Sequence, residues 1–207
     1  MVNRAIISGE VVNTPEFYKT LKNGTILLRF ILKVKRISGY EDMVPCIIKE
    51  KFAWQIKKGE MVRVIGRVMT NNLYPDGKCK LDVYVYVDKT EEFIEYENHV
   101  EFEGVICKES AMRTTMTGKV IVDFILAHNL NRHVSAYVPS IAWYENAAII
   151  DESKVGDRFL TVGRFQSREY SKNGEPRTAF EYCICSLLKV KKEVKHDECE
   201  NKICFSA

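Results

Sequence analysis

The 207-residue sequence contains no long hydrophobic run, and none of its stretches approaches the roughly 18 consecutive apolar residues that a membrane-spanning helix requires. Its first residues also lack the charged and then apolar pattern of a secretory signal peptide. The seven cysteines are odd in number and show none of the spacings of a disulfide framework, which favours reduced thiols. These absences predict a soluble, cytoplasmic protein.

Motifs of catalysis and metal binding are absent as well. The sequence has no Gly-rich phosphate loop, no nucleophile elbow and no His-Glu-x-x-His zinc motif. His196, Cys199 and Cys204 could bind zinc, but a structural zinc site needs four ligands and no fourth lies nearby. Cys183 and Cys185 lie within a predicted strand and are not a redox pair. The sequence therefore predicts no enzyme activity, no metal and no cofactor.

What the sequence does contain is a repeat, with the same landmarks in the same order in both halves. The landmark pairs are Asn3 and Asn98, Gly9 and Gly104, Phe30 and Phe124, Pro45 and Pro139, Gly59 and Gly156, and Gly66 and Gly163. Their offset changes only from 95 to 94 and then to 97 residues. Because solenoid repeats have periods of roughly 20 to 50 residues, each copy here should bury a core of its own. We predict domains at 1–95 and 96–191 and a short C-terminal tail at 192–207.

Within each copy the dominant hydrophobic period is two, which is typical of half-buried strands. The clearest stretches in the first copy are 3–12, 25–37, 61–69 and 80–87. Residues 49–57 have the composition of a short helix closed by Gly59, and the counterpart in the second copy is 141–151. Glycine-containing turns at 76–77 and 173–174 predict that each copy ends in a two-strand hairpin.

Three strands, a short helix and a two-strand hairpin are the layout of the OB-fold, a small and partly open barrel. The first strand of such a barrel bends sharply to join both sheets, and Gly9 and Gly104 lie where a small residue would allow that bend. We therefore predict an all-β protein with one short helix per repeat, built as two tandem OB-fold five-stranded barrels. An SH3-like barrel and an unrelated five-strand meander are the alternatives.

Several short motifs in the first copy carry a family resemblance. In order, they are Asn3-x₅-Gly9, Pro15-Glu16, Asn23-Gly24, Phe30-x-Leu32, Pro45-Cys46-Ile47, Phe52-Ala53, Lys58-Gly59-Glu60-x-Val62-x-Val64-x-Gly66-Arg67 and Asp76-Gly77-Lys78. The first copy resembles the bacterial single-stranded DNA-binding proteins along almost its whole length, and the second keeps the glycines and the Gly163-Arg164 strand. The resemblance implies sequence-independent binding of single-stranded DNA in replication, recombination or repair. It also implies a homodimer, because assemblies of that family usually contain four OB-folds.

The same resemblance makes the C-terminal tail informative. The family usually ends in a flexible linker and an acidic tip with a terminal Pro-Phe, which recruits other genome-maintenance proteins. Residues 192–207 keep acidic residues and Phe205, but they have no such linker and no terminal Pro-Phe. Replication or repair proteins remain expected partners, by a route that the tail does not specify. We expect no membrane partner and a location at the nucleoid.

Positive charge is concentrated in the first copy. Residues 1–93 contain 16 Lys and Arg against 11 Asp and Glu, a net charge of +5, whereas 97–190 contain 11 against 12, a net charge of −1. A polyanion should therefore lie mainly on the first copy, where the candidate phosphate contacts are Arg4, Arg29, Lys33, Lys35, Arg36, Lys49, Lys51, Arg67, Lys78 and Lys80. Those in the second copy are Arg132, Arg164, Arg168 and Lys172. Arg29, Lys33 and Lys35 share one face of a strand, for which the alternative is an ordinary solvated face.

Binding of single strands also needs flat side chains, because each base that stacks on an aromatic ring contributes roughly 1–3 kcal/mol. The aromatic candidates, chosen for their place in loops or beside cations, are Tyr40, Tyr74, Tyr137 and Tyr170. The phenylalanines at core phase, which we expect to pack inside, are Phe30, Phe124, Phe159 and Phe180. Trp54 and Trp143 are predicted to pack between helix and barrel.

Two functions of different class remain open from the sequence. The first is a sequence-independent binder of single-stranded DNA. The second is an OB-fold protein-interaction module in a replication or primosome-like assembly, with weak or no nucleic-acid binding, which the near-neutral second copy suits. RNA would fit the same surface chemistry as DNA. The charge difference also suggests a division of labour, in which the first copy binds nucleic acid and the second serves assembly.

Overall fold

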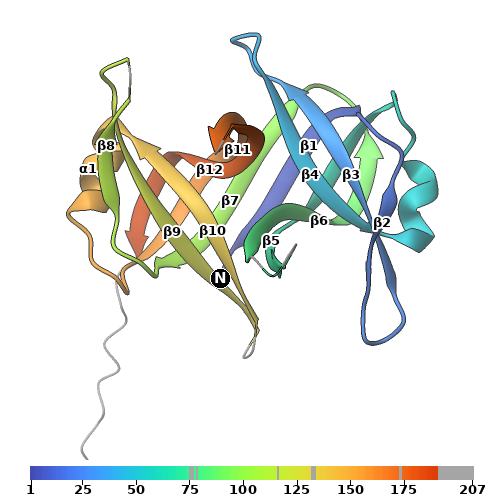
Figure 1. Ribbon diagram of the computed structural model, residues 1–207, viewed down its shortest axis with the longest axis horizontal. Helices are drawn as coiled ribbons and strands as arrows, with labels where there is room; N and C mark the ends of the chain where they lie inside the picture. The colour runs from blue at the N-terminus through green and yellow to red at the C-terminus, as the bar shows by residue number, and fades with distance from the viewer. Residues whose placement is uncertain (75–76, 78, 116, 132–133, 173, 191–207) are drawn as a thin grey trace, which may run out of the picture.

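The computed structural model describes residues 1–74, 77, 79–115, 117–131, 134–172 and 174–190, which form two β-barrels side by side (Figure 1). The first barrel contains β1 (Asn3–Val11), β2 (Glu16–Thr20), β3 (Ile26–Lys35), β4 (Glu41–Lys49), the 3₁₀ helix η1 (Glu50–Gln55), β5 (Met61–Leu73) and β6 (Lys80–Glu92). The second contains β7 (Glu97–Ile106), β8 (Ala111–Thr114), β9 (Val120–Asn131), β10 (Val134–Trp143), α1 (Tyr144–Asp151), β11 (Arg158–Lys172) and β12 (Glu175–Val190). These strands form one continuous sheet, and the predicted all-β class is confirmed.

Each barrel closes where its first strand changes partner. β1 pairs with β5 over most of its length and with β3 at its end, while β4 and β6 pair in parallel on the other side. A Cβ added at Gly9 would lie 2.3 Å from the carbonyl oxygen of Lys33, so the crossing of β1 over β3 requires glycine there, as predicted. At the equivalent Gly104 the nearest atom is the Cβ of Leu126, at 3.0 Å, and the crossing is looser.

The structure adds a short strand to each copy that the hydrophobic pattern does not predict. β2 and β8 form hairpins with the strands that follow them, at the two edges of the sheet. All four side chains of β8 are exposed, so this strand lacks the alternation that reveals half-buried strands.

The two predicted helices differ from the observed ones. η1 ends at Gln55, so Gly59 does not cap it; with φ of +83°, Gly59 instead belongs to the turn before β5. α1 begins at Tyr144 rather than at Ile141, because 141–143 continue the ladder between β10 and β9. In both copies the helical segment is therefore shorter than its composition suggested.

Most of the buried apolar side chains form one cluster that runs through both barrels. The core-phase phenylalanines belong to it or pack against it, as predicted: Phe30, Phe124, Phe159 and Phe180. Ala5 on β1 and Val100 on β7, which are equivalent in the two copies, face each other across an antiparallel ladder and are both fully buried. The prediction that each copy buries a separate core is therefore wrong, because this ladder joins the two cores.

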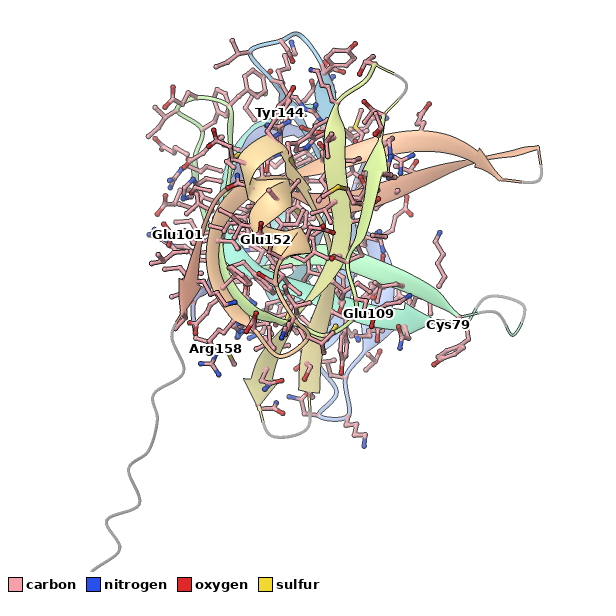
Figure 2. All side chains as sticks on the ribbon, turned by 90° about the vertical axis from the view of Figure 1, so that its left-hand side faces the viewer. Cys79, Glu101, Glu109, Tyr144, Glu152 and Arg158 are labelled. Carbon is pink, nitrogen blue, oxygen red and sulfur yellow. The ribbon has the colours of Figure 1, made fainter. Side chains whose placement is uncertain are left out.

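The two copies pack on each other with approximate two-fold symmetry. Thr70 Oγ1 on β5 accepts a hydrogen bond from the backbone N–H of Tyr137 on β10, at 2.9 Å. Ser167 Oγ on β11 accepts one from the backbone N–H of Met43 on β4, also at 2.9 Å, and these residues are the repeat equivalents of the first pair. The β5–β6 and β11–β12 hairpins thus each contact the other barrel, and both project to the same side (Figure 2).

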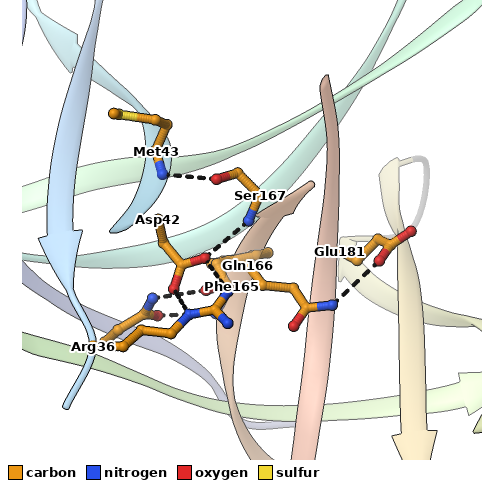
Figure 3. A network of polar contacts seen from close by, with 8 residues as sticks. Arg36, Asp42, Met43, Phe165, Gln166, Ser167 and Glu181 are labelled. Atoms are coloured by element: carbon orange, nitrogen blue, oxygen red, sulfur yellow. Dashed lines mark hydrogen bonds and ion pairs between the residues drawn. The ribbon is translucent and has the colours of Figure 1, made fainter. Parts of the chain in front are cut away.

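One contact between the barrels breaks this symmetry. Asp42 on β4 is fully buried and binds the guanidinium of Arg36 with both carboxylate oxygens, at 2.6 and 2.5 Å (Figure 3). It also accepts a hydrogen bond from the backbone N–H of Ser167, at 3.1 Å. The equivalent position in the second copy is Ala136, which has no carboxylate. The β11–β12 hairpin therefore donates a hydrogen bond to a buried carboxylate of the first barrel, and the equivalent position in the second barrel carries no such carboxylate.

Candidate nucleic-acid interface

The outer face of β3 carries the predicted basic stripe. Arg29, Lys33 and Lys35 alternate with buried core residues along the strand. Arg29 forms an ion pair with Asp82 at 2.8 Å, and Lys33 forms one with Glu10 at 2.8 Å. The hydrogen bond to Glu10 raises the pKa of Lys33. Two of the three cations are therefore already neutralised by a neighbouring carboxylate.

Two more of the predicted arginines are held in the same way. Arg36 binds Asp42 in the contact described above, and Arg67 on β5 binds Asp88 through Nε and Nη2, both at 2.9 Å. The hydrogen bond to Asp88 raises the pKa of Arg67. Much of the excess positive charge of the first copy is thus paired within the protein, and a phosphate would have to displace a carboxylate to reach these groups.

Other predicted cations form no ion pair with a carboxylate among the described residues. They are Arg4, Lys35, Lys49, Lys51 and Lys80. Lys35 lies 5.7 Å from the ring centre of Tyr96, and Lys51 lies 4.8 Å from that of Phe52. Lys78 and Arg132 fall outside the described residues, as do the side chains of Lys172 and Tyr170. The unpaired lysines of the first barrel are the cations most readily available to a phosphate backbone.

The predicted stacking tyrosines of the first barrel are exposed. Tyr40, in the loop between β3 and β4, exposes 72% of its surface, and Tyr74, directly after β5, exposes 65%. Tyr137 on β10 exposes 49% and lies beside the hairpin of the first barrel, through its backbone bond to Thr70. All three rings are accessible to a base.

Two further aromatic residues are exposed, although neither was predicted to bind. Trp54 is 72% exposed, so its predicted packing between helix and barrel is wrong; η1 has no buried residue and makes no apolar face for a tryptophan. Phe17 on β2 is 68% exposed, and it was not a candidate because β2 itself was not predicted.

A small apolar cluster on the outer side of the first barrel contains tyrosines that are not free to stack on a base. Tyr84 packs there with Leu27 and Ile47, and Tyr18 meets it edge-on at 5.7 Å between ring centres. Burial raises the pKa of Tyr84 to about 12. The guanidinium carbon of Arg67 lies over the ring of Tyr86, 5.6 Å from the ring centre. These rings pack against neighbouring side chains of the outer face and do not offer a free stacking surface.

The second barrel has a hollow of about 780 Å³ beside Arg164 on β11. Lys119, Trp143 and Tyr144 contribute to its lining, and none of them is among the predicted binding residues. Arg168, by contrast, binds Glu181 at 2.9 Å. The hollow therefore brings together cations and aromatic rings in the copy whose net charge is near neutral.

The described residues contain no group of three or more His, Cys, Asp or Glu side chains arranged to hold a metal ion. His196, Cys199 and Cys204 lie beyond them. No helix within the described part of the chain is long and apolar enough to cross a membrane.

Comparison with known proteins adds an independent line of evidence. No family model matches the chain. The single-stranded DNA-binding protein 2 of Listeria innocua is 28% identical over 111 residues, which make up 49% of this chain and 69% of the relative. The crystal structure of the wild-type single-stranded DNA binding protein from Thermus aquaticus matches with a TM-score of 0.72 at 21% identity, covering 92% of this chain and 94% of that one. Over these ranges the chain is similar to two bacterial single-stranded DNA-binding proteins.

A deletion mutant of the Thermus aquaticus single-stranded DNA binding protein gives a TM-score of 0.73 at 21% identity, over 95% of this chain and 98% of that one. The match extends over both barrels, so the predicted resemblance and the tandem OB-folds are confirmed. Sequence identity at this level supports the fold and does not carry over individual contacts.

Proposed function

We propose that the chain binds single-stranded DNA independently of sequence and protects it in replication, recombination or repair. The single observation that carries the proposal is the match of both barrels to the Thermus aquaticus single-stranded DNA binding protein. The relationship to the Listeria innocua protein supports it from the sequence. In this role the protein is a cytoplasmic, nucleoid-associated binder that needs neither a catalytic group nor a cofactor.

The exposed side chains of the first barrel supply both kinds of contact that a single strand needs. Tyr40 and Tyr74 offer ring faces on which bases stack, and Lys35 and Lys51 offer charge without an internal carboxylate. A phosphate can reach the paired arginines only if it displaces their carboxylate partners. We therefore expect the lysines to contribute more to phosphate binding. OB-folds bind roughly 4 to 16 nucleotides each, which sets the expected site size per barrel.

We also propose a homodimer with four barrels. The ladder between β1 and β7 and the two interlocking hairpins already pair two barrels within one chain. A second chain would add another such pair. We also propose that the two domains of each chain are residues 1–95 and 96–191. Replication or repair proteins are the expected further partners.

The alternative function is a protein-interaction module in a replication or primosome-like assembly. The net charge of −1 over 97–190 favours it, because a near-neutral surface suits a protein partner better than a polyanion. Under this alternative, a discrete partner would stay bound at high salt while affinity for oligonucleotides would be negligible.

A competition experiment tests the proposed function. A labelled single-stranded oligonucleotide bound to the protein is challenged with an unlabelled single strand, with a duplex and with an RNA of equal length. Displacement by the single strand at much lower concentration than by the duplex supports the proposal, because stacking needs unpaired bases. Equal displacement by the duplex points to charge alone and contradicts it. The RNA competitor identifies the preferred sugar.

A further inference from the structure

Equivalent arginines of the two copies have different surroundings. In the first barrel, Arg67 is bound by Asp88 and lies over the ring of Tyr86. Its equivalent in the second barrel is Arg164, at an offset of 97 residues. The same offset places Cys183 where Tyr86 stands and Cys185 where Asp88 stands. Both groups that hold Arg67 are therefore replaced by small, uncharged side chains around Arg164.

Arg164 is partly buried and has no ion pair with a carboxylate among the described residues. Its Nε is buried and has no hydrogen-bond partner among the described residues, whereas Nε of Arg67 donates to Asp88 at 2.9 Å. A buried guanidinium N–H without an acceptor is costly, and native structures usually satisfy such groups with a protein, solvent or ligand atom. Space for a ligand is present, because the hollow of about 780 Å³ opens beside Arg164.

The rest of the lining has the chemistry of a nucleotide site. Lys119 adds a second, exposed cation, and Tyr144 is 59% exposed at the start of α1 (Figure 2). Trp143, at the end of β10, lines the same hollow as Cys183 and Arg164. Glu145 is the one carboxylate of the lining, and the two cations outweigh it. Planar rings beside cations suit a base and its phosphate.

We propose that this hollow is a nucleotide-binding subsite, in which Arg164 and Lys119 bind a phosphate of the single strand and Trp143 or Tyr144 stacks on a base. This inference rests on the proposed function and deepens it, because it assigns a principal contact to the second barrel despite that copy's net charge of −1. In the first barrel, Asp88 binds the guanidinium of Arg67, and the equivalent surface holds two smaller hollows, of about 180 and 300 Å³.

The matched pair Arg164→Gln and Arg67→Gln tests the assignment by affinity for a labelled oligothymidylate. We expect Arg164→Gln to weaken binding by about tenfold or more, because a charge-assisted, bidentate phosphate contact is lost. Arg67→Gln should weaken it by less than about threefold, because that guanidinium is already bound to a carboxylate. Equal losses in the two variants, or no loss in Arg164→Gln, would overturn the proposal. Circular dichroism checks that both variants are folded.

A second pair of variants keeps the test independent of any folding defect. Cys185→Asp gives Arg164 the carboxylate that Asp88 gives Arg67, at a site whose side chain is exposed. Cys107→Asp adds the same charge at an exposed cysteine that does not line the hollow. Binding should weaken in Cys185→Asp and stay close to wild type in Cys107→Asp. Similar affinities in the two variants would contradict the subsite.

Alkylation of the wild-type protein gives a readout that does not depend on substitution. A saturating oligothymidylate should slow the reaction of Cys185 with iodoacetamide and leave that of Cys107 unchanged, as followed by mass spectrometry of the two peptides. An unchanged rate at Cys185 in the saturated complex would overturn the subsite alone. Failure of the wild-type protein to bind the oligonucleotide at all would instead remove the proposed function itself.

Discussion

At the scale of single residues, ion pairing decides which cations a nucleic acid can reach. The sequence predicts correctly that Arg29, Lys33 and Lys35 share one strand face, because strand periodicity is a local property. It does not predict that Arg29 is bound by Asp82, 53 residues away, or Arg67 by Asp88, 21 residues away. Such pairs depend on the register between strands, which cannot be derived from the number of charged residues. The net charge of +5 in the first copy is therefore larger than the charge available to a polyanion.

The exposed tyrosines give the most direct residue-scale prediction. Substituting Tyr40 and Tyr74 together by Ala should weaken binding of single-stranded DNA by more than about 1.5 kcal/mol, because two stacking surfaces are lost. Fluorescence anisotropy with a labelled oligonucleotide measures the change. The matched control substitutes both by Phe and should retain most of the affinity, since stacking uses the ring. Unchanged affinity in the double alanine variant would count against these two rings as stacking platforms.

Buried Asp42 gives a second prediction at this scale, for stability. Asp42→Ala should lower the free energy of unfolding by about 3 kcal/mol, because it leaves Arg36 and the Ser167 N–H without their acceptor in a buried contact. Urea denaturation measures the loss. Asp88→Ala is the matched control, because the Arg67 pair is nearly half exposed on both sides and should contribute only about 0–1 kcal/mol. A loss in Asp42→Ala no larger than that in Asp88→Ala would show that the buried carboxylate adds no more stability than an exposed pair.

At the scale of secondary-structure elements, prediction succeeds where an element has one buried face. The long strands were found because their apolar residues recur every second position. The edge strand β8 was missed because none of its side chains is buried, and α1 was extended too far because Ile141 packs as part of β10. The hollow near Trp143 was also not predicted. Its sequence signal is the pair of cysteines at the repeat positions of Tyr86 and Asp88. That signal can be recognised only when the repeat alignment is combined with the strand pairing.

The crossing of β1 over β3 supplies an element-scale prediction. Gly9→Ala should destabilise the protein by about 2–3 kcal/mol, because the added Cβ would meet the carbonyl oxygen of Lys33 at 2.3 Å and the strands would have to separate. Gly104→Ala should cost clearly less, because its nearest neighbour is a side-chain carbon, at 3.0 Å. Thermal unfolding of the two variants gives the comparison. If Gly104→Ala were the more damaging, the account of barrel closure would be wrong.

At the scale of the whole molecule, the repeat predicts two barrels but not how closely they are joined. The ladder between β1 and β7 and the hydrogen bonds of Thr70 and Ser167 come from residues far apart in the chain. They make a continuous core, which a repeat period alone does not reveal. The chain thereby presents two barrels in one fixed, nearly symmetric arrangement with both long hairpins on one side (Figure 2).

This arrangement leads to a prediction about assembly. If a second chain completes a set of four barrels, light scattering during gel filtration should give a mass of about twice 23.9 kDa at micromolar concentration. A mass of one chain, unchanged on concentration and on addition of oligonucleotide, would show that two barrels are the complete unit.

The central claim is that these paired barrels bind unpaired nucleic acid through charge and ring stacking. Its most direct test is an anisotropy titration of a labelled oligothymidylate of about 30 nucleotides, long enough for both barrels of one chain. The account predicts saturable binding in dilute buffer, with affinity that falls on a log-log plot by about 0.7 for each phosphate neutralised as salt is added. An oligonucleotide whose anisotropy stays at the value of the free strand, even at low salt and high protein concentration, would contradict it.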